Sequence, residues 1–272
     1  MKTHQHIKIA LLLLLLHTIF ASIIYAGKIR DIHLSNIHGT KFTVSWVSEE
    51  DESAMIRYGT SVEDYDNWEL AYDVRGEYTI DEIHYITTHN LIPDTLYYYE
   101  IISGELTDNN SGRYYRLNPG PALAPRGGSC QPAGKVYKDI NSLTPAYDTI
   151  VYLNIIDATA ENNSLTESCL VTQSTSGYWA IDLINTRTKA NNAYYSFECG
   201  ISDIHVIAQS GRDGTGQLIT KSIDFVFSNE TETIRPNLIV QPEIPPDLFI
   251  DVDADGKMGL KELIYLLKMI VQ

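Results

Sequence analysis

After the first 27 residues, hydrophobic and polar residues alternate in short runs separated by polar turns, and a period of 3.6 residues is almost absent. A period of two is typical of antiparallel β-strands with one buried face. In residues 41–48, KFTVSWVS, the side chains of Phe42, Val44 and Trp46 share one face of the predicted strand. We therefore expect this strand to bury its even-numbered side, and the alternation repeats in residues 54–61.

Residues 84–103, HYITTHNLIPDTLYYYEIIS, contain an L-x-P-x-T-x-Y string from Leu91 to Tyr97, and alternation continues beyond it. Here the chain resembles the fibronectin type III family, and Trp46 and the ending GRYYRLNPGP fit the same pattern. The resemblance implies a sandwich over residues 27–121 in which Tyr97 packs at a corner and bonds back to the backbone. This stretch is also similar to the sandwich that precedes the catalytic domain of purple acid phosphatases. That family's metal-ligand motifs are absent downstream, so the resemblance implies a spacer or binding module.

A Pro- and Gly-rich stretch, PGPALAPRGGSCQP, marks a boundary, and we place a linker at residues 122–133. Seven short apolar runs follow within residues 134–232 and predict a second β-sandwich. Their order and the turn at Ser176–Trp179 resemble carboxypeptidase regulatory-like and other immunoglobulin-like modules. The fold class is therefore mostly β, with two sandwiches. Residues 233–248 are rich in proline and are expected to be a second linker.

The last segment, residues 249–272, contains DVDADGKMGLKE, which fits a 12-residue calcium loop. Aspartates fill positions 1, 3 and 5, glycine fills position 6, and a glutamate that can bind with both oxygens fills position 12. Alternate side chains of such a curled loop point inward, so carboxylates and one backbone carbonyl can surround a hard cation. The predicted Ca²⁺ ligands are Asp251, Asp253, Asp255, the carbonyl of Lys257, and Glu262.

The calcium loop is preceded by Pro242, Pro245 and Pro246, which prevent the incoming helix of a complete EF-hand. A loop followed by one helix resembles a single repeat of a dockerin, a module that docks on cohesins; dockerins have two repeats, and this chain has one. The predicted helix, residues 260–271, is apolar on most sides and needs a partner. Two alternatives stay open: the helix folds back on the second sandwich, or it docks on a protein partner.

The chain begins with two lysines, a leucine-rich run and Ala26, an order typical of a secretory signal over residues 1–26. An uncleaved anchor is the alternative, because the apolar run of residues 9–26 is long enough to span a bilayer. Removal of residues 1–26 leaves 18 basic and 35 acidic residues, a net charge of −17. Such a surface repels nucleic acid and anionic lipid, so we expect a secreted or cell-surface protein.

Three cysteines, Cys130, Cys169 and Cys199, are expected to form one disulfide and leave one free thiol, without indicating which pair is bonded. None of their spacings is that of a zinc site.

The sequence offers little support for catalysis. The five histidines after residue 27 stand alone or out of phase, and there is no nucleophile elbow, phosphate-cradling glycine loop or catalytic Cys-His pair. Acids such as Asp81 and Glu82 leave a hidden glycosidase pair as the least favoured alternative. Tyr98, Tyr114 and Tyr115 could stack on sugars from an outer sheet face, although cross-strand packing is the simpler interpretation.

These observations predict an exported, non-catalytic, calcium-binding modular protein for surface or extracellular binding and assembly. The alternative is a carbohydrate-binding accessory protein. The expected partners are accordingly a protein on the C-terminal helix or a carbohydrate.

Overall fold

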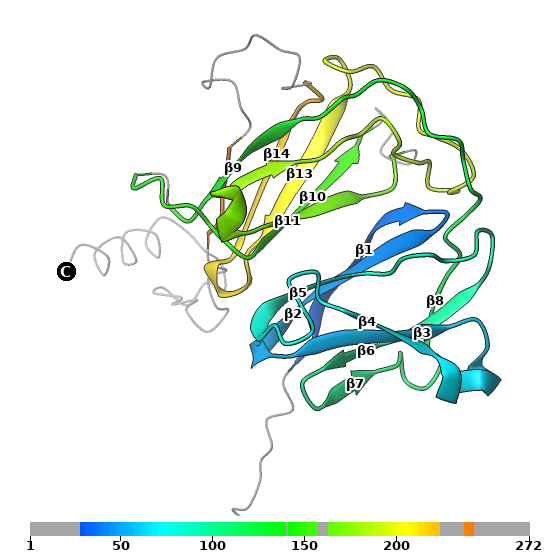
Figure 1. Ribbon diagram of the computed structural model, residues 1–272. Helices are drawn as coiled ribbons and strands as arrows, with labels where there is room; N and C mark the ends of the chain where they lie inside the picture. The colour runs from blue at the N-terminus through cyan, green and yellow to red at the C-terminus, as the bar shows by residue number, and fades with distance from the viewer. Residues whose placement is uncertain (1–27, 140, 157–162, 224–236, 242–272) are drawn as a thin grey trace, which may run out of the picture.

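A computed structural model describes residues 28–139, 141–156, 163–223 and 237–241. Two β-sandwiches lie against each other, with strands β1–β8 in one and β9–β15 in the other (Figure 1). The prediction of a mostly β protein with two sandwiches is confirmed. Helical structure among the described residues is limited to three short 3₁₀ turns: Val62–Asn67 (η1), Gln173–Thr175 (η2) and Gly211–Asp213 (η3). None of the described helices has the length and apolar character needed to cross a bilayer.

The first sandwich packs a three-stranded sheet against a larger sheet. The smaller sheet has the order β1-β2-β5, and its strands are Arg30–His38 (β1), Lys41–Glu52 (β2) and Asp81–Thr87 (β5). The larger sheet runs β4-β3-β6-β7, and β8 also pairs with β6. Its strands are Ala54–Gly59 (β3), Glu69–Tyr72 (β4), Tyr97–Ser103 (β6), Leu106–Asp108 (β7) and Tyr115–Leu117 (β8). All pairings in both sheets are antiparallel.

The core of the first sandwich contains the residues that the alternating pattern predicts to be buried. Phe42, Val44 and Trp46 are fully buried between the two sheets, and the indole Nε1 of Trp46 donates a hydrogen bond to Ser103 Oγ. At the corner before β6, the hydroxyl oxygen of Tyr97 accepts a hydrogen bond of 2.9 Å from the backbone N–H of Ile92. The tyrosine corner implied by the fibronectin type III resemblance is thereby confirmed.

The second sandwich packs a four-stranded sheet, β11-β10-β13-β14, on a three-stranded sheet, β12-β9-β15. The strands of the four-stranded sheet are Thr149–Ile155 (β10), Glu167–Val171 (β11), Asp203–Gln209 (β13) and Thr215–Lys221 (β14). The three-stranded sheet comprises Ala133–Tyr137 (β9), Tyr178–Ala180 (β12) and Leu238–Ile239 (β15). Apolar side chains from both sheets, Trp179 and Leu153 among them, form its buried core.

Strand β15 lies in the proline-rich stretch that the sequence indicated as a linker. It pairs in parallel with β9, and Leu238 and Val240 are buried in the second core. The apolar run Leu238–Val240 is too short, and too close to prolines, to be recognised as a strand from its sequence. In the structure it covers apolar surface that would otherwise be exposed to solvent.

Strand β2 buries its even-numbered side, as the alternation predicts, but its odd-numbered side is buried as well. Thr43, Ser45 and Val47 have no exposed surface. The cause is the second sandwich, whose strand β10 covers the outer face of the β1-β2-β5 sheet (Figure 1). The two sandwiches therefore share an extensive interface.

Candidate binding site between the sandwiches

The predicted calcium ligands, Asp251, Asp253, Asp255, Lys257 and Glu262, lie outside the described residues, as does the predicted helix of residues 260–271. The predicted signal segment, residues 1–26, lies outside them too. The calcium site and the signal therefore stay predictions from the sequence.

The five histidines are dispersed over both sandwiches. His33 packs on the Tyr152 ring, His38 contacts Glu167, His205 contacts Gln217, and His89 is exposed. Within the ranges that the structure describes, no group of three or more His, Cys, Asp or Glu residues could hold a metal ion.

His84 is the one fully buried histidine of the described chain, lying on β5 against the Trp46 ring. Its Nε2 is 2.8 Å from Ser48 Oγ, and its Nδ1 has no hydrogen-bond partner. Burial lowers the pKa of His84 to about 4, despite the nearby carboxylates of Asp73 and Asp81. The folded protein therefore holds this ring in its neutral form.

An apolar cluster forms the centre of the interface between the sandwiches. Val47, Ile83 and Tyr85 from the first sandwich meet Ile150 and Tyr152 of β10. All five are buried. Non-polar burial of this kind stabilises the association, since each fully buried side chain contributes about 1.5–3 kcal/mol relative to exposure.

Hydrogen bonds surround the apolar cluster. Ser45 Oγ lies 2.7 Å from the Tyr152 hydroxyl, and both groups are buried. Asn36 Nδ2 donates to the Tyr85 hydroxyl at 2.8 Å, and Asn36 Oδ1 accepts from the backbone N–H of Ser168 on β11. Ser45 and Asn36 of the first sandwich therefore have hydrogen-bond partners in the second.

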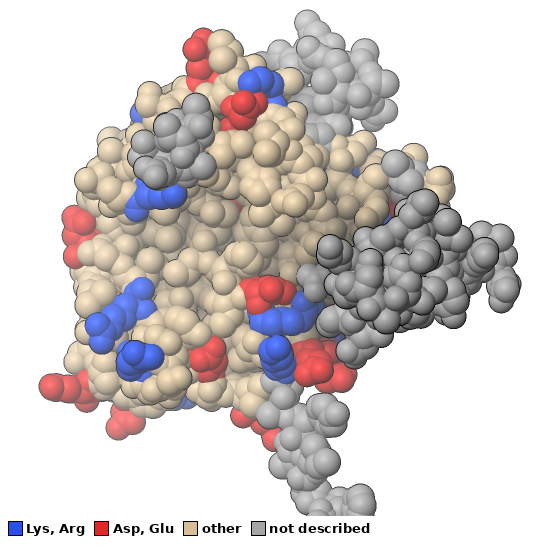
Figure 2. Space-filling model, turned by 180° about the vertical axis from the view of Figure 1, so that it is seen from behind, with Lys and Arg blue, Asp and Glu red and all other residues tan. Residues whose placement is uncertain are grey.

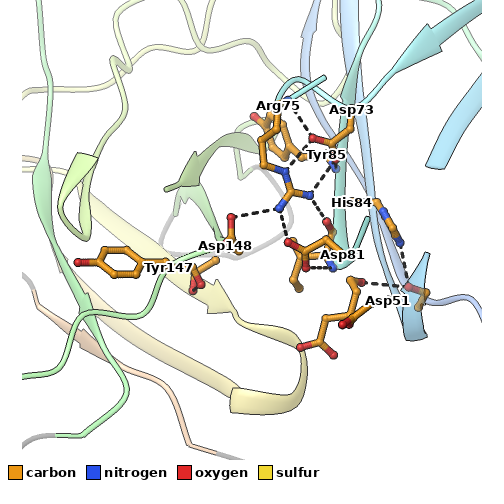
Figure 3. Close-up of polar contacts among 12 residues, drawn as sticks. Asp51, Asp73, Arg75, Asp81, His84, Tyr85, Tyr147 and Asp148 are labelled. Carbon is orange, nitrogen blue, oxygen red and sulfur yellow. Dashed lines mark hydrogen bonds and ion pairs between the residues drawn. The ribbon is translucent and has the colours of Figure 1, made fainter. Parts of the chain in front are cut away.

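Arginine side chains close one edge of the interface. Arg75 Nε donates to Asp73 at 2.8 Å, and its Nη1 donates to Asp81 at 2.6 Å and to Asp148, just before β10, at 3.1 Å. Figure 3 shows Arg75 among these three carboxylates, two from the first sandwich and one from the second. Burial opposes the charge, but the hydrogen bonds and charges of the aspartates raise the pKa of Arg75 above its ordinary value. Arg75 thus works as an ionic bridge between the sandwiches.

A second ionic bridge between the sandwiches involves Glu82, the other acidic residue named in the sequence analysis as part of a possible glycosidase pair. Arg212, in η3, donates to Glu82 at 2.9 Å and also pairs with Asp51. Asp81 and Glu82 thus each bind an arginine. These ion pairs give both carboxylates a role in the interface.

At another edge, the two sandwiches enclose an open groove of about 480 Å³. Its walls come from the β1–β2 turn, from residues 122–125, from the start of β11 and from residues 180–194. The β1–β2 turn packs tightly here, because a Cβ added to Gly39 would lie 2.6 Å from the carbonyl oxygen of Pro121. The volume falls within the roughly 300–1,000 Å³ typical of small-molecule sites.

Polar and charged side chains line the groove. His38 Nε2 is 3.1 Å from Glu167 Oε2. Asp182 Oδ1 accepts hydrogen bonds from the backbone N–H groups of Cys130 and Ile184. Lys41 and the buried Arg187 also line it. None of these residues lies in a recognisable motif, because the groove is assembled from four segments far apart in the sequence.

The tyrosines that could stack on sugars pack on other side chains instead. Tyr115 stacks on Tyr99 across the β6–β8 pair, with ring centroids 5.1 Å apart, and Tyr98 lies under Arg116. Tyr114 contacts the Trp68 ring. For Tyr115 the simpler interpretation, cross-strand packing, is confirmed.

Cys130 and Cys199 form a disulfide, and Cys169 is free, which confirms the predicted one bridge and one thiol. Burial raises the pKa of the Cys169 thiol to about 12. This thiol is therefore unreactive at neutral pH.

Comparison with known proteins supports the fold assigned to the first sandwich. Residues 29–115 match the family described as Purple acid Phosphatase, N-terminal domain. This fibronectin type III-like module defines the class of the first sandwich and indicates a modular binding domain. No curated protein matches the chain. Among solved structures, the chain is similar to the crystal structure of the chicken CNTN1 FN1-FN3 domains, with 12% identity, a TM-score of 0.26, and coverage of 72% of this chain and 65% of that one.

Proposed function

We propose that this chain is an exported, non-catalytic binding and assembly protein: a rigid body of two sandwiches carrying a C-terminal calcium-binding loop and docking helix. The observation that supports it most is the shared interface. An apolar cluster, buried hydrogen bonds and two arginine bridges hold the sandwiches together. A fixed body of this kind can present a terminal docking element in a defined position.

The described part of the chain ends at a fixed point of the second sandwich. Gln241 forms a bridge with Thr215, the first residue of β14. The first predicted calcium ligand, Asp251, follows ten residues later. The predicted calcium loop therefore follows closely in sequence on residues that are anchored in the second sandwich.

Calcium is the proposed cofactor because aspartates, a glycine and a terminal glutamate occupy the positions that this loop requires. Mutual repulsion of the carboxylates disfavours the loop without metal. Calcium binding would fix the start of the following helix and present its apolar side chains to a protein partner.

The test follows helicity by circular dichroism while calcium is added to the processed chain. Helicity should rise with calcium, and Asp251→Asn should suppress the rise. The matched control is Asp66→Asn, which removes the same charge from an exposed residue of η1. Equal helicity with and without calcium in the unmodified chain would refute the proposal. A calcium-dependent pull-down from the source's own secreted proteins then tests docking.

Export to the cell surface or medium is part of the proposal and rests on residues 1–26. Sequencing the N-terminus of the exported protein tests it, with Gly27 expected as the first residue. The acidic balance argues against nucleic acid and anionic membranes as partners. On the face in Figure 2, lysines and arginines are interspersed with acids and form no basic patch.

Carbohydrate binding is the second candidate function, and the groove favours it specifically. The groove combines carboxylate, amide and cationic side chains with apolar ones and the ring of Tyr194. Such a set can bond sugar hydroxyls and pack against the C–H face of a pyranose ring. A glycan array, repeated with a calcium chelator, separates the candidates, because chelation should abolish docking and spare groove binding.

A further inference from the structure

The loop between β4 and β5 presents the densest group of exposed apolar side chains in the described part of the chain. Ten large apolar side chains are exposed there, and three of them lie in residues 74–80: Val74 at 51%, Tyr78 at 86% and Ile80 at 63%. The remaining seven are spread over other segments. Exposed apolar side chains that gather in one place mark interaction sites, whereas scattered ones are ordinary.

The base and the tip of this loop are both held by hydrogen bonds. The backbone N–H and Nε of Arg75 donate to Asp73, and Nη1 of Arg75 donates to Asp81 at the start of β5 (Figure 3). At the tip, the N–H of Thr79 donates to the carbonyl oxygen of Gly76 at 3.1 Å. A partner can therefore bury the apolar side chains without first ordering the loop, which lowers the entropic cost of binding.

The described chain ends at the same edge of the molecule. Gln241 exchanges two backbone hydrogen bonds with Thr215, which follows η3. In η3, Arg212 binds Glu82, and Glu82 is two residues from Ile80. The chain beyond Gln241 therefore starts near the loop, and eighteen residues, 242–259, separate Gln241 from the predicted helix.

The predicted helix, residues 260–271, complements the loop in apolar character and in charge. It is apolar on most sides, and its two lysines, Lys261 and Lys268, are seven residues apart and so share one side. Residues 73–82 carry four acids and one arginine, a net charge of −3. Opposite charges of this kind favour association and fix its orientation.

We propose that the helix of residues 260–271, once ordered by calcium, docks in cis on the apolar loop of residues 74–80, so that an external partner must compete with this loop for the helix. Burial of Tyr78 and Ile80 supplies the favourable free energy. Bound calcium favours the contact because it compensates the aspartates that precede the helix. This inference rests on the calcium-binding helix of the proposed function and adds an autoinhibited state to it.

A second copy of the chain is a weaker candidate for the loop. The loop belongs to a protein whose net charge after removal of residues 1–26 is −17, so two copies repel each other. The helix of the same chain is tethered nearby and is therefore present at a high effective concentration.

Thiol labelling of the processed chain tests the contact. Thr79→Cys places a thiol between Tyr78 and Ile80 without removing either side chain. Calcium should slow its reaction with a maleimide by about tenfold, as for a site that is covered about nine-tenths of the time. The matched control is Thr95→Cys, because Thr95 is also half-buried and stands beside the exposed Leu96.

Two further samples complete the experiment. The unmodified chain measures the background from the free Cys169. Leu267→Asp, added to Thr79→Cys, puts a charge on the apolar helix and should restore fast labelling in calcium, while circular dichroism checks that calcium still induces the helix.

Each result decides the inference. Slower labelling of Thr79→Cys in calcium, reversed by Leu267→Asp and absent from Thr95→Cys, supports it. Unchanged labelling while calcium induces the helix would overturn it and keep the calcium proposal. Slowing that grows with protein concentration would overturn the contact in cis in favour of a second copy. Absence of any calcium effect on helicity and on labelling would overturn both proposals.

Discussion

The hydrogen bond between Ser45 and Tyr152 offers a direct test of the interface, since it joins strands β2 and β10 of different sandwiches. Its two oxygens are 2.7 Å apart, Ser45 has no exposed surface, and Tyr152 is 4% exposed. Tyr152→Phe removes one hydroxyl and keeps the ring. The substitution leaves the Ser45 hydroxyl buried without its partner.

The expected cost follows from that unmet hydroxyl. A buried polar group that loses its partner costs about 1–3 kcal/mol of unfolding free energy. Replacing both partners, Ser45→Ala with Tyr152→Phe, should cost less than the sum of the single changes, with a coupling of about 0.5–3 kcal/mol. The apolar cluster around Ile150 stays in place, so the sandwiches should still unfold together.

Urea unfolding of the oxidised protein measures these effects. Tyr152→Phe should lower the midpoint without changing the slope, which reports the surface exposed on unfolding. The control is Tyr98→Phe, because Tyr98 is half-buried beneath Arg116 and its change should stay within about 0.5 kcal/mol. Equal stability of Tyr152→Phe and the control, or two separate transitions in the unmodified protein, would refute a shared interface.

Three further predictions concern stability. The folded protein keeps His84 neutral down to about pH 4, whereas an unfolded histidine binds a proton near pH 6.5. The stabilisation from keeping His84 neutral is complete above pH 6.5 and is lost as the pH falls toward 4. The unfolding free energy should therefore decline less steeply across this range in His84→Gln than in the unmodified protein. Parallel curves of unfolding free energy against pH would contradict this. Replacing Cys130 and Cys199 by serine opens a loop with a sequence separation of 69 and should cost about 4 kcal/mol in urea unfolding, and unchanged stability would count against the bridge. Tyr97→Phe removes the acceptor of the Ile92 N–H and should cost about 0.5–1.5 kcal/mol by thermal melting; an unchanged melting temperature would argue against the corner.

The sequence predicted the local features of the fold well, because strand alternation is set by neighbouring residues. The burial of Phe42, Val44 and Trp46 and the corner at Tyr97 follow from short patterns. The polar side of β2 could not be predicted in the same way. Ser45 finds its partner 107 residues away, and nothing near Ser45 indicates that a second sandwich covers it.

The groove was beyond sequence reasoning for the same reason. Lys41 and Arg187 lie 146 positions apart in the sequence, and neither stands in a motif. Only folding brings the four segments of the groove together. The calcium ligands, by contrast, fall within twelve consecutive residues, so a local pattern suffices to predict them.

The central claim is that an acidic loop at the end of a two-sandwich body binds calcium. Isothermal calorimetry of calcium with the processed chain tests it most directly, with Asp251→Asn beside Asp66→Asn, because position 1 of the loop requires an aspartate. A saturable heat is expected that is lost or strongly weakened in Asp251→Asn and kept in Asp66→Asn. No heat up to millimolar calcium, or the same heat in Asp251→Asn as in the unmodified chain, would contradict calcium binding by this loop.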